Sequence, residues 1–134
     1  RVSRGLGDVY KRQRFLVAKE CGVHQNYKNK VLKANDIATM STGKRLGHPV
    51  RSIKNPYTKE YFKLEYSNIS DEELEAYGRG SLYRAAVEGD EKTGCFLAGQ
   101  IAGMVNKEQT AKEIIEEIFT QAEDVLKGAT KWVK

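Results

Sequence analysis

The chain has 134 residues and a formal net charge of +5, with 40% hydrophobic and 31% charged residues. This length and balance are typical of one folded domain with a modest core. No apolar run approaches the ~20 residues of a membrane-spanning helix, and the first residues lack the apolar segment of a signal peptide, so we expect no membrane partner and no secretion.

The first 34 residues contain two unlike segments. Residues 1–13, RVSRGLGDVYKRQ, carry charges and glycines but no apolar periodicity that would predict packing. Residues 14–20, RFLVAKE, contain three consecutive apolar residues and predict the end of a buried strand. The helical spacing of Tyr27, Val31 and Leu32 then predicts a helix over about residues 25–34.

Short extended segments are expected next. Residues rich in β-branched and turn types predict extended pieces at about 37–42 and 50–53, joined by a turn at 43–47. Pro49 biases the preceding residue, His48, toward an extended backbone, which argues against a helix at this point.

Capped helices follow in the middle of the chain. Pro56 suits the first turn of a helix. Ser70, with Glu73 three residues later, forms a capping-box pattern and predicts a helix that ends near Gly78. A further helix is expected over about residues 81–89.

The last third of the chain is also predicted to be helical. Residues 96–104, FLAGQIAGM, are expected to form a helix whose small residues allow a ligand or another helix to approach closely. Thr110 and Glu113 repeat the capping pattern. The apolar stripe of the last helix, which includes Ile114 and Val125, predicts packing against a core.

The charges and cysteines limit the possible partners. Residues 24–63 contain nine Lys or Arg against two acids, whereas residues 108–126 contain six acids against one lysine. The basic stretch is interpreted either as a solvated face or as a surface for an acidic partner. No zinc-ligand spacing or RNA-binding signature accompanies it, so we expect no metal and no nucleic acid. The widely separated Cys21 and Cys95 favour reduced thiols and a cytoplasmic location.

Three segments carry a resemblance to an enzyme family: RFLVAKECGVHQNYKNKVLKA at 14–34, GHPVRSIKN at 47–55 and GCFLAGQIAGMVNKEQTAKEII at 94–115. In order and spacing they resemble the C-terminal part of the flavin-dependent enoyl-[acyl-carrier-protein] reductase II family, within the nitronate monooxygenase (2-nitropropane dioxygenase) group. The resemblance implies an α/β fold, namely an FMN-binding (β/α)8 TIM barrel. Such a barrel needs about 250 residues, so this chain would be only its C-terminal part, mostly helical with one or two short strands.

The resemblance also divides the chain. Residues 14–134 would comprise the last barrel strand, an inserted subdomain at about 36–70 and C-terminal helices. In the family a Gly-Thr pair that holds the FMN phosphate precedes the position of Arg14, whereas Arg12 and Gln13 stand there in this chain. We therefore expect residues 1–13 to be a non-native or disordered leader, with a variant phosphate loop as the alternative.

Site residues follow from the same resemblance. The residues that match cofactor-binding segments are Arg14, Phe15, Ala98, Gly99 and Gln100. Those expected on the substrate side are His48, Phe96 and Leu97. Core packing is the alternative for the last two, and a hydrogen bond to a neighbouring loop is the alternative for Gln100. The family's active-site histidine lies on an earlier strand, so no catalytic residue is expected in this chain.

The implied reaction is the reduction of enoyl-[acyl-carrier-protein] in bacterial fatty acid synthesis, with FMN as cofactor and NADH or NADPH as co-substrate. The residues expected to bind the acidic acyl carrier protein are Lys44, Arg45, Arg51 and Lys54. The full-length enzyme is expected to be a homodimer and this chain alone to be inactive. Two alternatives remain: a nitronate monooxygenase segment, and a stand-alone, non-catalytic binding module.

Overall fold

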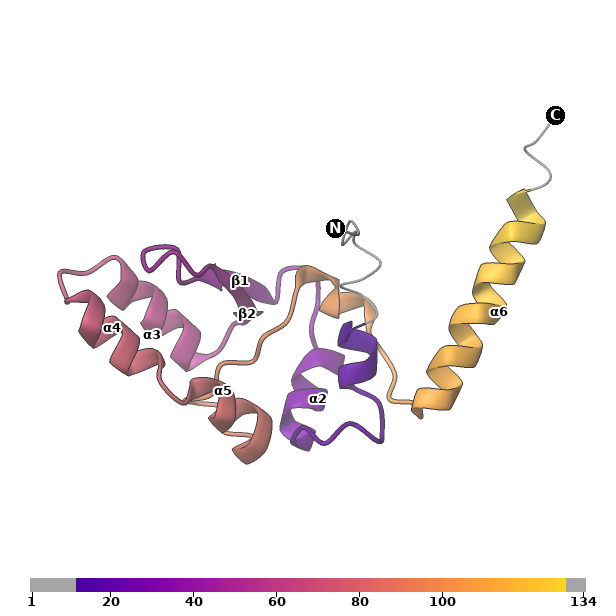
Figure 1. Cartoon of the computed structure of the whole chain (residues 1–134), viewed down its shortest axis with the longest axis horizontal. Helices are drawn as coiled ribbons and strands as arrows, with labels where there is room; N and C mark the ends of the chain where they lie inside the picture. Colours follow the sequence, from indigo (N-terminus) through magenta and orange to yellow (C-terminus); the bar gives the residue numbers. More distant parts are fainter. Residues whose placement is uncertain (1–11, 130–134) are drawn as a thin grey trace.

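The computed structural model describes residues 12–129 as an elongated molecule (Figure 1). After a helical turn at residues 12–16, the elements are α2 (Gln25–Leu32), β1 (Thr39–Thr42), β2 (Val50–Ile53), α3 (Pro56–Glu65), α4 (Asp71–Gly78), α5 (Ser81–Tyr83), a π-helix (Arg84–Glu88), a 3-10 helix (Gln100–Met104) and α6 (Ala111–Ala129). The hairpin, α3 and α4 lie at one end, α2 lies in the middle, and α6 projects as an arm at the other end (Figure 1). No helix within the described range is long and apolar enough to cross a membrane.

Most of the predicted helices and strands are confirmed, and their caps explain their boundaries. Ser70 accepts a hydrogen bond from the backbone N–H of Glu73, whose side chain bonds back to the Ser70 N–H. Thr110 and Glu113 make the same reciprocal bonds at the start of α6. At the start of α3, Asn55 forms a box of this kind with a threonine. These bonds satisfy amide donors that the first helical turn leaves unpaired.

The predicted strand at residues 14–20 is wrong, because residues 12–16 are helical and residues 17–20 form turns. Val17 is fully buried, and the N–H of Lys19 donates to the carbonyl of Gln109 at 2.9 Å. A run of three apolar residues does not distinguish a buried strand from a buried helical turn. The strands β1 and β2 of the described residues form one antiparallel pair.

The helix predicted over residues 96–104 is wrong in its first half. β1 and β2 pair antiparallel, with Thr39 opposite Ile53, and residues 96–98 pair with β2. Ile53 N–H donates to the Phe96 carbonyl at 2.8 Å, and Ala98 N–H donates to the Arg51 carbonyl at 3.1 Å. The edge of β2 thus provides backbone partners that outweigh the weak helix propensity of a glycine-containing segment.

Two hydrophobic clusters hold the described residues together. The larger joins the turn after residues 12–16, α2 and the segment near residue 96. The smaller lies around Tyr57, Tyr61, Leu74 and Cys95.

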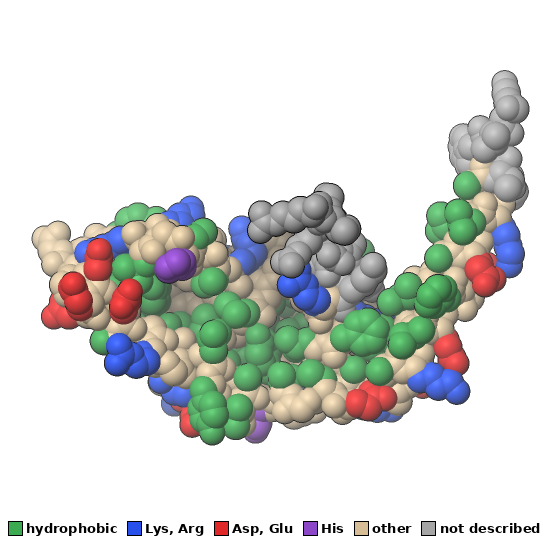
Figure 2. Space-filling view, viewed as in Figure 1, with side chains coloured by type: hydrophobic (Ala, Val, Ile, Leu, Met, Phe, Trp, Pro, Cys, Tyr) green, Lys and Arg blue, Asp and Glu red, His purple; other side chains and the backbone are tan. Residues whose placement is uncertain are grey.

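The expectation that α6 packs onto a core holds only at its start, where Ile114 is buried. Phe119, Val125 and Leu126 are 66%, 71% and 69% exposed. Figure 2 shows hydrophobic side chains along α6 that continue into the middle of the molecule. The apolar periodicity therefore identified a helix with a face suited to burial, but the described residues cover only its first turn.

Candidate functional site

A cavity of about 390 Å³ brings together segments that lie more than 80 residues apart in sequence. Its lining residues are Arg12, Gln13, Val50, Arg51, Leu97, Ala98 and Gly99. We call this cavity the arginine pocket. It joins the helical turn at residues 12–16 to the outer edge of the short sheet, and it contains the predicted cofactor residues Ala98 and Gly99.

The polar groups of the arginine pocket suit an anionic ligand that also carries hydrogen-bond donors. Arg12 and Arg51 each supply a guanidinium group, which stays charged at any physiological pH. Arg51 is held by a 3.2 Å hydrogen bond from Nη1 to Thr39 Oγ1. Gln13 is only 7% exposed, and its Oε1 atom has no hydrogen-bond partner among the described residues. A buried, unpaired amide oxygen is costly unless a ligand or water donates to it.

Extended backbone at residues 96–98 separates two predicted site residues onto opposite faces. Leu97 lines the arginine pocket. Phe96 is fully buried, and its ring lies edge-on to that of Tyr27, with centroids 5.1 Å apart. The position of Phe96 matches its alternative, core packing, and contact between Phe96 and a substrate stays a prediction.

The model of the nitronate monooxygenase family matches residues 2–121 of this chain. The chain belongs to the nitronate monooxygenase family. Its structure is similar to that of FabK from Thermotoga maritima, with a TM-score of 0.85 and 35% identity over 90% of this chain and 38% of that chain. A single-residue mutant of the same FabK matches with a TM-score of 0.75 and 31% identity, over 90% of this chain and 36% of that chain.

This chain therefore spans less than two fifths of the solved FabK chains that it matches. The match confirms the predicted fold class, a mostly helical part of a TIM-barrel protein with two short strands. The nitronate monooxygenase family consists of flavin-dependent oxidoreductases.

The family match includes most of the segment predicted to be a leader. Residues 1–11 lie outside the described residues. Arg12 and Gln13 are helical, and Gln13 is buried in the arginine pocket, so the prediction of disorder does not hold for these two positions. Sequence reasoning missed both as site residues, because they interrupt the Gly-Thr pattern of the family. The break in the Gly-Thr pattern at residues 12 and 13, directly before the matching segment that begins at Arg14, is the sequence signal that could have identified them.

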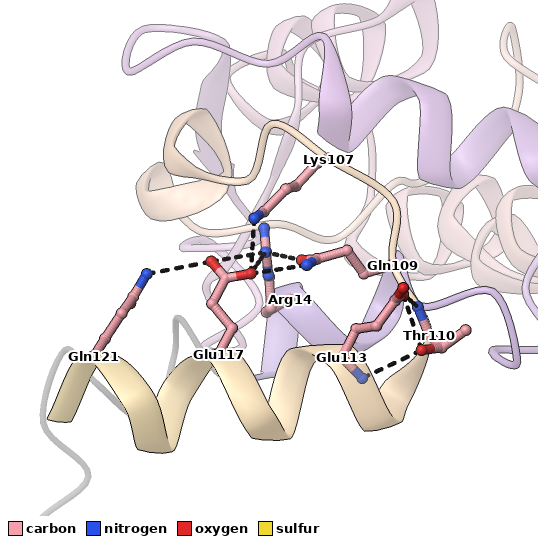
Figure 3. Close-up of polar contacts among 7 residues, drawn as sticks. All are labelled: Arg14, Lys107, Gln109, Thr110, Glu113, Glu117 and Gln121. Carbon is pink, nitrogen blue, oxygen red and sulfur yellow. Dashed lines mark hydrogen bonds and ion pairs between the residues drawn. The ribbon is translucent and has the colours of Figure 1, made fainter. Parts of the chain in front are cut away.

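The other predicted cofactor residues differ in their placement. Arg14 is 3% exposed and is not among the residues that line the arginine pocket; its guanidinium donates to Gln109 and pairs with Glu117 of α6 at 3.3 Å (Figure 3). Its side chain thus anchors α6. Phe15 is half-buried, and Gln100 is exposed at the start of the 3-10 helix. Contact between these three residues and a cofactor stays a prediction.

His48 lies beside a second cavity, which has a volume of about 200 Å³ and which Leu97 also lines. The structure thus brings together two of the three residues predicted on the substrate side. Within residues 12–129 no group of three or more His, Cys, Asp or Glu side chains is placed to hold a metal ion.

The four residues predicted to bind an acidic protein do not form one uniform surface. Arg45 pairs with Asp71 at 2.8 Å and donates to two backbone carbonyls, so its charge already serves the fold. Lys54 Nζ donates to the Ile37 carbonyl at 2.8 Å. Arg51 lies in the arginine pocket, whereas Lys44 is exposed on the hairpin turn. Lys44 is therefore the best placed of the four to meet a partner.

Proposed function

We propose that this chain is the C-terminal segment of an FMN-dependent enoyl-[acyl-carrier-protein] reductase. The observation that carries the proposal is the arginine pocket, because two segments that resemble the reductase II branch meet there at the edge of a shared cavity. The 35% identity to FabK supports the reductase branch of the family. The substrate would be an enoyl thioester of acyl carrier protein, and the co-substrate NADH or NADPH.

The residues of the arginine pocket fit FMN by their chemistry. Arg12 and Arg51 would hold its phosphate, since guanidinium groups suit phosphate oxygens. Gln13 Oε1 would accept a hydrogen bond from a ligand hydroxyl or N–H. Gly99 and Ala98 present little side-chain bulk, so a ligand can approach their backbone. The chemistry that FMN supplies when bound is hydride transfer from the nicotinamide to the enoyl β-carbon.

The apolar face of α6 favours a segment of a larger body over a stand-alone module. Ile115, Phe119, Val125 and Leu126 are all at least 46% exposed. They belong to one helix whose contacts with the other described residues lie in its first two turns, at Ala111, Ile114 and Glu117. A contiguous exposed apolar surface of this kind usually meets another protein surface. In the longer protein we expect the preceding barrel to cover it.

The competing reaction in the same family is nitronate oxidation. To separate the two, the longer protein from the gene that contains this sequence would be assayed with two substrate pairs. We expect NADH-dependent reduction of a crotonyl thioester without oxygen, and a much lower rate with a nitronate and oxygen. If the protein oxidises the nitronate but does not reduce the crotonyl thioester, the nitronate monooxygenase alternative replaces the reductase assignment. A protein that binds no flavin would contradict both. Cytoplasmic location and a homodimer stay predictions.

A further inference from the structure

The cavity beside His48 is a slot that enters the smaller hydrophobic cluster. Its walls are formed mainly by Val50, Tyr57, Tyr61, Leu82, Cys95 and Leu97. We call it the tyrosine slot. It lies between the hairpin, α3, the end of α4 and the start of α5, and its volume is about 200 Å³.

The lining of the tyrosine slot is essentially uncharged. None of the described residues that line it is an Asp, Glu, Lys or Arg. Burial raises the pKa of Tyr57 to about 12, although a hydrogen bond with Ser81 opposes the rise. Burial likewise raises the pKa of the Cys95 thiol. Both groups are therefore neutral at physiological pH, and the slot suits an apolar ligand much better than a phosphate or a carboxylate.

The tyrosine slot adjoins the arginine pocket. Val50 and Leu97 line both cavities, so these two side chains form the boundary between them. An apolar chain that lies beside a ligand in the arginine pocket can therefore pass Leu97 and enter the slot.

We propose that the tyrosine slot receives the distal, apolar part of the acyl chain of a thioester substrate, and that it sets the preference for chain length. This inference rests on the proposed reductase function. The occupant is argued from two features together: uncharged aromatic walls, and a shared boundary with the cavity that suits the cofactor.

Gly78 keeps the slot open. A Cβ atom at this position would lie 3.5 Å from Tyr61 Cε2 and 3.8 Å from the Tyr57 hydroxyl, which are ordinary contact distances. Neither a positive φ nor a clash therefore demands glycine here. A larger side chain could be built on the same backbone, and it would occupy the space between the two tyrosines.

The test measures binding rather than turnover, in the FMN-loaded longer protein, by calorimetric titration with octanoyl and butyryl N-acetylcysteamine thioesters. Both are saturated, so neither is reduced. We expect the wild-type protein to bind the octanoyl compound at least about tenfold more tightly, because more apolar surface is buried. Gly78→Leu is expected to abolish that difference. Ala76→Leu, which enlarges an exposed residue of the same helix, is expected to preserve it.

A second variant keeps the proposal testable if Gly78→Leu does not fold. Leu82 lines the slot but is 53% exposed, so Leu82→Trp narrows the entrance without disturbing a core. We expect this variant also to lose the preference for the longer chain. An equal affinity of the wild-type protein for the two thioesters, or a preference that survives both slot variants, would overturn the proposal. Neither result would affect the reductase assay, and a failed reductase assay would leave these affinities measurable.

Discussion

Arg14 and Glu117 form an ion pair between residues 103 positions apart, with Nη2 lying 3.3 Å from Oε2. The pair connects the helical turn next to the arginine pocket with the second turn of α6 (Figure 3). Glu117 also accepts hydrogen bonds from Lys107 at 2.7 Å and from Gln109 at 2.7 Å. The Glu117 carboxylate therefore connects α6 both with residues 107–109, which precede it, and with the helical turn at residues 12–16.

Replacing Glu117 should loosen α6. Arg14 is 3% exposed, so Glu117→Gln leaves a buried guanidinium without its ionic partner. We expect the free energy of local unfolding of α6 to fall by about 1–3 kcal/mol. The measurement is hydrogen exchange of the α6 amides, which should become faster. Glu116→Gln, which removes a carboxylate that pairs with exposed Lys112 on the same helix, is the control and should have little effect. Equal exchange rates in the two variants would show that the Arg14 pair does not anchor the helix.

The same carboxylate should make α6 sensitive to acid. A hydrogen bond from Lys107 and a second from Gln109 lower the pKa of Glu117 below its ordinary value. A lowered folded-state pKa contributes stability that is present above the ordinary glutamate pKa and is lost as the pH falls through the lowered value. The difference in unfolding free energy between the wild type and Glu117→Gln should therefore be constant near pH 7 and shrink below about pH 4.5. Urea unfolding followed by circular dichroism at several pH values would measure it, and a difference independent of pH would contradict the assignment.

Two glycines in the hairpin turn allow the cost of backbone strain to be measured separately from the cost of a steric clash. Gly43 and Gly47 have φ values of +78° and +74°. At Gly43 a Cβ atom would lie 2.6 Å from the His48 carbonyl oxygen, whereas at Gly47 no heavy atom lies within 4 Å. Gly47→Ala should cost about 1–2 kcal/mol for the left-handed backbone alone, and Gly43→Ala about 1–3 kcal/mol more. Thermal unfolding of both variants compares them, and equal losses would show that the turn relaxes around the new methyl group.

Lys44 is expected to affect the rate of reduction only for substrates that are attached to acyl carrier protein. Because it is exposed and Arg45 is committed to Asp71, Lys44→Glu changes the charge of the turn with least disturbance to the fold. In the longer protein at low salt, kcat/KM for an enoyl-[acyl-carrier-protein] should fall about tenfold through slower association. The rate with a crotonyl thioester that lacks the carrier should not change. If the rates with both substrates are unaltered, this turn does not meet the carrier protein.

Local signals predicted the elements whose causes are local. Ser70 with Glu73, and Thr110 with Glu113, make in space the bonds that their spacing predicted. Residues 96–98 were mistaken for a helix because their partner is the edge of β2, more than 40 residues earlier in the chain. Their pairing places Phe96 in the core and Leu97 in both cavities, which a helical pattern could not indicate.

The candidate site was predicted in part for the same reason. Ala98 and Gly99 line the arginine pocket, and their contact with a cofactor stays a prediction, whereas Arg14 faces α6 because Glu117 and Gln109 lie on that side. Gln13 was assigned to a leader, since nothing in its local sequence shows that its side chain becomes buried. Burial of this kind depends on the residues that fold over it, which only the structure provides.

The most direct test of the account is the affinity of the longer protein for FMN, measured by quenching of flavin fluorescence. Arg51→Gln removes a guanidinium from the arginine pocket, and Gly99→Leu fills it at a backbone conformation that any residue adopts, φ −78° and ψ 171°. Gly22→Leu is the control, because a Cβ atom at that exposed position meets no other heavy atom within 4 Å. We predict that the Kd rises at least about tenfold in each pocket variant and is unchanged in the control. Wild-type affinity in both pocket variants would contradict the assignment of this cavity to the cofactor.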